Sequence, residues 1–266
     1  MKRREWIQKN KRMWITLGIG LTLLVLGVVL TAVTRRAAIA EGASAVAKVP
    51  FALGLIMILT GILVPLAGLI PKKKTTDVRT LSMAALFAAL CYIGFTYCKI
   101  DIPVGMEKTA FHLGNVFCVL AALFLGGLWG GMAGAVGMTI ADLTTAYVTS
   151  APKTFLLKLC IGLITGFVAH KIFKLSQERE DRKLPLTAAT AISCAAGMAF
   201  NMVADPLVGY FYKMYVLGVP QEAAGIWAKI GAVTTSVNAV VAVIAATVLY
   251  MALRKPMKRT DLLPKL

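Results

Sequence analysis

Residues 111–166 read FHLGNVFCVLAALFLGGLWGGMAGAVGMTIADLTTAYVTSAPKTFLLKLCIGLITG. They contain two long apolar runs joined by a glycine-rich corner, GGLWGG, and then a short loop and the start of a third apolar run. The stretch also places Asn115, Asp142 and Lys158 inside or at the edge of segments of hydrocarbon length. Charged side chains in such segments are costly and usually functional. We therefore expect these three groups to line a pocket for a small molecule.

The composition predicts a membrane protein. The chain has 266 residues, of which 58% are hydrophobic, and its mean hydropathy is +0.77. Several apolar runs approach the ~20 residues that an α-helix needs to cross a bilayer. The runs are continuous rather than alternating, which argues against a β-barrel. The predicted fold class is therefore an all-α polytopic membrane protein.

A charged, proline-started segment, PKKKTTDVR at 71–79, divides the apolar runs into two groups. We predict a basic N-terminus and a two-helix transmembrane hairpin in residues 1–72, followed by a six-helix core in 73–266, with eight spans in all. Small residues near Ala38 and Ala40 leave a cleaved signal peptide as the alternative for the first run. The six core segments are expected at about 80–97, 111–128, 130–148, 154–172, 186–208 and 229–252.

The net charge of +17 is better explained by topology than by nucleic-acid binding. The basic segments lack interleaved aromatic residues, and Lys and Arg collect in the cytoplasmic loops of membrane proteins. Eight spans would place most of these residues on the side of the N-terminus. We therefore expect both termini in the cytoplasm. The basic segments on that side are 1–12, 71–79, 171–183 and 254–265.

With this topology, polar residues converge in the outer half of the core. At ~1.5 Å per helical residue, five antiparallel helices each place one or more polar groups near their outer ends. Convergence of this kind indicates a cavity open to the outside, and an aromatic loop at 209–228 is expected either to cover it or to form an interface belt. The predicted ligand contacts are Asn115, Asp142, Lys158, Asn201, Asn238 and Trp227.

Purely structural roles for the same residues are also possible. Asp142 and Lys158 are also compatible with a structural ion pair between neighbouring helices. Asn201 and Asn238 are compatible with hydrogen bonds that hold helices together. The glycine repeats in 126–134 are typical of close helix packing.

The sequence offers little for redox, metal or nucleotide chemistry. Its five cysteines have no CxxC spacing, its two histidines form no HExxH pattern, and neither GxxxxGK[ST] nor GxGxxG occurs. We therefore predict no disulfide, metal site or cofactor and no enzymatic activity. If ATP drives the protein, another chain binds it.

At these residues the sequence resembles the substrate-binding S component of energy-coupling factor (ECF) transporters, most closely the riboflavin and pyridoxine type. The resemblance covers roughly 77–253. It is carried by HLGN at 112–115, LFLGGLWGGMAGAVG at 123–137, IADL at 140–143 and APKTFLLKLCIG at 151–162.

The resemblance implies six core helices, cytoplasmic termini and a vitamin site near the outer surface that extracellular loops close. It implies a subunit of an ATP-driven importer in a bacterial plasma membrane, which binds riboflavin, pyridoxine or a hydroxymethylpyrimidine-like precursor. The expected partners are the lipid bilayer, a transmembrane coupling subunit and two ATPases. Docking to the coupling subunit would use an AxxxA face, here Ala84 and Ala88. The N-terminal hairpin departs from the family pattern.

Two other functions compete with this hypothesis. A stand-alone secondary transporter would use Asp142 and Lys158 for proton coupling, although no inverted repeat is evident. A membrane enzyme would need a nucleophile–base pair or metal cluster, and Asp142 and His112 have no such partner spacing.

Overall fold

The computed structural model describes residues 11–39, 54, 57, 78–105, 107–177 and 184–260. The chain divides into two compact units, which are described separately. The first unit comprises Met1–Thr75 with Lys213–Val219, and the second comprises Thr76–Tyr212 with Pro220–Leu266. We call the second unit the core.

The first unit contains the long helix α2 (Lys11–Ile39). Its sequence is apolar on every side, and the hydroxyls of Thr22, Thr31 and Thr34 donate to carbonyls one turn earlier in the same helix. Gly54 lies against Thr31. Most of the second predicted apolar run, 50–70, lies outside the described residues.

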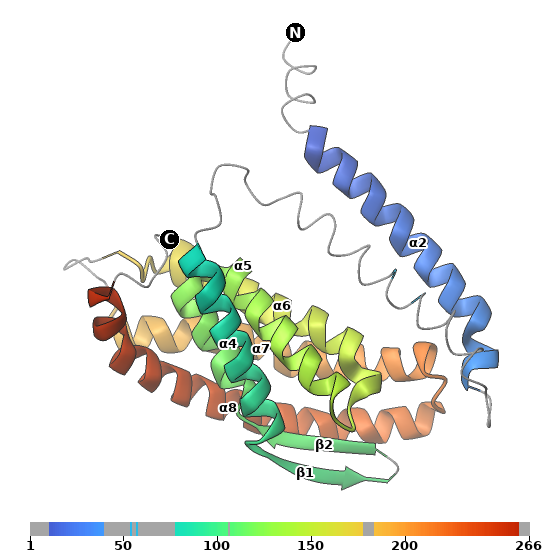
Figure 1. Ribbon diagram of the computed structural model, residues 1–266. Helices are drawn as coiled ribbons and strands as arrows, with labels where there is room; N and C mark the ends of the chain where they lie inside the picture. The colour runs from blue at the N-terminus through green and yellow to red at the C-terminus, as the bar shows by residue number, and fades with distance from the viewer. Residues whose placement is uncertain are drawn as a thin grey trace. The chain divides into compact units, whose positions relative to one another are not determined.

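The core is a helical bundle with a β-hairpin across one end, which we call the hairpin end (Figure 1). Strands β1 and β2 pair antiparallel, with Lys99 opposite His112 and Val104 opposite Glu107. The core elements are α4 (Val78–Thr96), β1 (Lys99–Val104), β2 (Glu107–His112), α5 (Gly114–Leu143), η1 (Val148–Ser150), α6 (Ala151–Phe167), η2 (Val168–Ile172), α7 (Leu186–Phe211) and α8 (Gln221–Arg259), and all of η3 (Tyr212–Val216) except its first residue belongs to the first unit.

Helix α5 reverses direction at Gly126, where φ is 81° and ψ is 171°. Gly130 packs against Ala122, and Gly134 packs against Cys118. A straight helix would separate Ala122 from Gly130 by about 12 Å, so these contacts require two antiparallel arms. The tight corner predicted from GGLWGG is confirmed. A left-handed φ of this kind favours glycine because a Cβ would clash with the backbone.

Among the described residues, six helices are long and apolar enough to cross a membrane, and α5 is one of them although it folds back on itself. The chain is therefore a polytopic α-helical membrane protein. The predicted total of eight spans depends on residues outside the described ranges and stays a prediction. The β-hairpin was not predicted, because residues 98–110 were assigned to a loop between spans.

Glycines allow α5 and α6 to approach until their backbones touch. Gly131 faces Gly162, and Gly127 faces Gly166, so each helix contributes two glycines one turn apart. A Cβ at any of these positions would meet backbone atoms of the other helix. In a membrane, moving apolar surface from lipid into a helix interface contributes little free energy. Close approach at small residues stabilises the interface instead, through van der Waals contact.

Replacing Gly131 with Val should lower the thermal unfolding midpoint in detergent, because overpacking a tight core costs about 1–3 kcal/mol or more. Gly231 of α8 is the matched control, since nothing lies within 4 Å of the Cβ it would gain. Gly231→Ala should leave the midpoint unchanged or raise it. Equal midpoints for Gly131→Val and the wild type would contradict the packing argument.

Candidate ligand-binding site

The hairpin end is closed by bonds between α8 and the backbone of the hairpin. The Asn238 side chain accepts a hydrogen bond from the backbone N–H of His112 and donates one to the carbonyl of Ala110, both at 3.0 Å. The hydroxyls of Thr109 and Thr234 are 2.8 Å apart. These contacts fix β2 against α8, and they engage both the donor and the acceptor of the Asn238 amide.

The outer strand is held by Trp227, whose indole N–H donates to the carbonyl of Val104 at 3.1 Å. On the other side of the hairpin, the Tyr147 hydroxyl donates to Asp101 at 2.8 Å. The Lys99 amine lies 3.3 Å from Asp101 and 4.9 Å from the centre of the Tyr147 ring. The hairpin is therefore fixed from α8 and from the segment that follows α5.

Beneath the hairpin, the Lys158 amine donates to the Asn115 side-chain oxygen at 2.9 Å. Lys158 is 6% exposed and Asn115 is 2% exposed. Within the described ranges no carboxylate lies within 4 Å of this amine, so Lys158 and Asp142 do not form the direct ion pair considered from the sequence. The ammonium carries three N–H groups. The described residues supply an acceptor for one of them.

Five further buried polar atoms in this half of the core have no hydrogen-bond partner among the residues that the structure describes. They are Thr96 Oγ1, Thr139 Oγ1, Asp142 Oδ2, Asn201 Oδ1 and His112 Nδ1. Asp142 and Asn201 are 2% and 1% exposed. An unmade hydrogen bond at a buried polar group costs about 1–3 kcal/mol. A ligand that supplied the missing partners would recover that free energy.

His112 adds an uncharged polar group. Its ring lies 4.7 Å from the Phe95 ring, centre to centre. Burial, with a smaller effect of the nearby Lys158 ammonium, lowers the pKa of His112 to about 3. The imidazole is therefore neutral at physiological pH.

A bridge across three helices completes this end of the core. Asp205 on α7 accepts a hydrogen bond from the Lys153 amine of α6 through Oδ1, and one from the Thr235 hydroxyl of α8 through Oδ2, both at 2.8 Å. The pairing of Asp205 with Lys153 and Thr235 was not predicted from the sequence. The available signal was the position of Asp205 one turn beyond Asn201.

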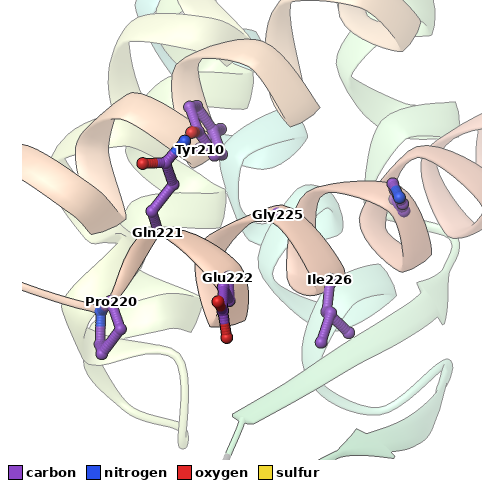
Figure 2. Close-up of a pocket in the computed structure, with 7 residues that line it drawn as sticks. Tyr210, Pro220, Gln221, Glu222, Gly225 and Ile226 are labelled. Carbon is purple, nitrogen blue, oxygen red and sulfur yellow. The ribbon is translucent and has the colours of Figure 1, made fainter.

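An open pocket of about 680 Å³ lies beside the hairpin end, between the end of α7 and the start of α8 (Figure 2). Tyr210 from α7 faces the first turns of α8 across it. None of the six predicted ligand contacts lines this pocket. Its lining consists of Tyr210, Pro220, Gln221, Glu222, Gly225, Ile226 and Lys229.

The structure thus brings Asn115 and Lys158 into contact and buries Asp142 and Asn201 within the same half of the core. It places Asn238 and Trp227 as supports of the hairpin. Direct ligand contact by any of the six stays a prediction. Asn238 bonds to hairpin backbone instead of joining two membrane helices.

The family model described as ECF-type riboflavin transporter, S component, matches residues 75–255. The chain belongs to this family. No curated protein and no solved structure matches it. The family consists of transport subunits and not of enzymes, which confirms the expectation of a non-enzymatic ECF S component. It also indicates a vitamin-type substrate-binding role in transport.

Replacing Asn238 with Leu should release the hairpin, because it removes two hydrogen bonds and leaves buried backbone groups without partners. The expected result is faster hydrogen–deuterium exchange of the His112 amide by roughly tenfold or more, measured by mass spectrometry of hairpin peptides. Ser236→Ala is the matched control, since the Ser236 hydroxyl donates only to Ala232 within α8. Unchanged exchange in Asn238→Leu would show that Asn238 does not hold the hairpin.

Proposed function

We propose that the protein is the membrane receptor of an ATP-driven importer and captures a small, water-soluble vitamin or precursor beneath the β-hairpin. The candidates are riboflavin, pyridoxine and hydroxymethylpyrimidine-like compounds. The observation that carries the proposal is the group of buried polar atoms without protein partners in the hairpin half of a transporter-family core.

The donor and acceptor pattern suits a heteroaromatic ring with polar edges. Asp142 Oδ2 and Asn201 Oδ1 accept hydrogen bonds, and the remaining N–H groups of Lys158 donate them. The hydrogen bond to Asn115 orients the Lys158 ammonium and uses one of its N–H groups, so the other two point away from Asn115. The neutral His112 ring and Phe95 lie against the hairpin end and provide flat surfaces.

We propose that the hairpin end faces the cell exterior. The acidic residues within the described part of the core all belong to the hairpin half: Asp101, Glu107, Asp142, Asp205 and Glu222. The described core has seven basic residues at the opposite ends of its helices, Arg79, Lys171, Lys174, Arg254, Lys255, Lys258 and Arg259, against five in the hairpin half, Lys99, Lys108, Lys153, Lys158 and Lys229. The excess of Lys and Arg on one side supports cytoplasmic termini in a bacterial plasma membrane.

We further propose that a transmembrane coupling subunit, itself joined to two ATPases, contacts α4. Ala84 is 7% exposed and belongs to the core, and Ala88 packs on Gly137. The adjacent pair, Ala85 and Ala89, is exposed. The accessible small-residue face of α4 is therefore the Ala85/Ala89 side, and we assign docking to it in place of Ala84 and Ala88.

Ligand binding is tested with the purified protein and riboflavin, pyridoxine and hydroxymethylpyrimidine as separate probes. Lys158→Met and Asn115→Leu should each weaken binding of the active probe by roughly 10- to 100-fold, the range for a hydrogen bond to a charged group. Lys229→Met, in the open pocket, is the control and should bind as the wild type does. Full affinity in both Lys158→Met and Asn115→Leu would contradict this site.

Docking is tested by uptake in cells that contain the coupling subunit and ATPases. Ala85→Phe with Ala89→Phe should abolish uptake while the purified variant keeps its ligand affinity, because large rings prevent close helix approach. Val203→Phe, on an exposed position of α7, is the control for added bulk. Uptake by the wild type in cells without ATPases would favour the stand-alone transporter.

A further inference from the structure

We infer that Asp205 holds the net charge of the ligand site at zero and thereby makes the site selective for an uncharged ligand. The inference rests on the proposed function, since it concerns the ligand that this site takes. It assigns a specificity role to a residue that has no free oxygen for the ligand.

Both oxygens of Asp205 are used within the protein. Oδ1 accepts from Lys153 and Oδ2 accepts from Thr235, each at 2.8 Å, so one carboxylate joins α6, α7 and α8. The side chains of Lys153 and Asp205 are 14% and 25% exposed. A well-aligned pair in this largely enclosed position is screened less by salt than a surface pair.

The formal charges of the ionised groups around the site sum to zero. Asp205 lies one turn from the buried Asn201 on α7 and binds Lys153, which belongs to the same helix as Lys158. With the buried Asp142, these groups amount formally to two cations and two anions in one half of the core. Lys99 nearby is paired with Asp101 at 3.3 Å. His112 contributes no charge, as argued above. A ligand with net charge would therefore enter a low-dielectric site that holds no opposite net charge to receive it.

Replacing Asp205 would change the charge of the site without removing a proposed ligand contact. Asp142 and Lys158 have unused polar atoms and are proposed ligand contacts, so substituting them removes charge and contact together. Asp205→Asn keeps the shape of the side chain and its position between three helices while it removes one negative charge. The site would then carry a formal charge of +1 and favour an anionic ligand.

The experiment uses the full-length protein and two probe pairs, riboflavin with riboflavin 5′-phosphate and pyridoxine with pyridoxine 5′-phosphate. The readout is the ratio of Kd values within a pair. A phosphate monoester adds about −1.5 to −2 charge at pH 7. The wild type should prefer the uncharged member. Asp205→Asn should shift the ratio toward the phosphate ester by about 15-fold per unit of ligand charge for a separation of 10 Å, at an effective dielectric constant near 20, which is about 70- to 270-fold for a charge of −1.5 to −2.

Two variants separate charge from structure. The double variant Lys153→Met with Asp205→Asn restores zero formal charge and should return the ratio toward that of the wild type. Thr235→Val breaks one hydrogen bond of the bridge without changing charge, so it should leave the ratio unchanged even if both affinities fall. A merely structural role of Asp205 would give the same ratio in Asp205→Asn and Thr235→Val.

If Asp205→Asn does not elute as a folded, monodisperse protein, Lys153→Met alone tests the inference with the opposite sign. It leaves a formal charge of −1 and should strengthen the preference for the uncharged member. An unchanged ratio in these charge variants, or a wild type that binds the phosphate ester as tightly as the uncharged form, would overturn the inference and leave the proposed function standing. Failure of all these probes and of hydroxymethylpyrimidine to bind would overturn both.

Discussion

The close approach of backbones at the glycines of α5 and α6 is the constraint on which the rest of the core depends. The reversal at Gly126 returns the end of α5 to the level of its start, so Asn115 and Asp142 occupy the same half of the bundle. Contact between Gly131 and Gly162 then brings α6 near enough for Lys158 to reach Asn115. Larger side chains at these glycines would separate the helices and with them the polar groups. The geometry of the site is thus a consequence of residues that have no side chains.

Because the polar groups of the hairpin end are buried, each of them that lacks a hydrogen bond raises the free energy of the folded protein. In a membrane, water cannot satisfy a donor or acceptor that the protein leaves unpaired, and each such group costs free energy. The structure meets part of this demand through the Asn238 bonds to the hairpin and the Asp205 bridge between three helices. Among the atoms left without a partner are side-chain atoms of Asp142, Asn201 and His112, and these are the atoms on which the proposed ligand site rests.

Sequence reasoning succeeded where the signal was a long apolar run or a glycine cluster. The polytopic helical class and the corner at Gly126 were predicted from the length of the apolar runs and the glycine cluster, and the family was predicted from the resemblance of motifs such as HLGN at 112–115 and APKTFLLKLCIG at 151–162. The hairpin was missed because strand alternation over KIDIPV is short and lies between much stronger helical signals. The resemblance placed docking on Ala84 and Ala88, and the sequence offered no check on their exposure, because a helix that is apolar on every side carries no periodic signal of which face is buried. Lys153 and Thr235 were overlooked because pairing across three helices depends on helix rotation, which spacing along one chain does not determine.

The bonds that hold the hairpin determine which of its residues can be substituted. Asn238 and Trp227 bind main-chain atoms of residues 104, 110 and 112, so their grip does not depend on which side chains those residues carry. Substitutions at strand positions other than Asp101 and Thr109, whose side chains also bond to Tyr147 and Thr234, would therefore leave these backbone bonds in place. The same helices could hold hairpins of different sequence without being rebuilt.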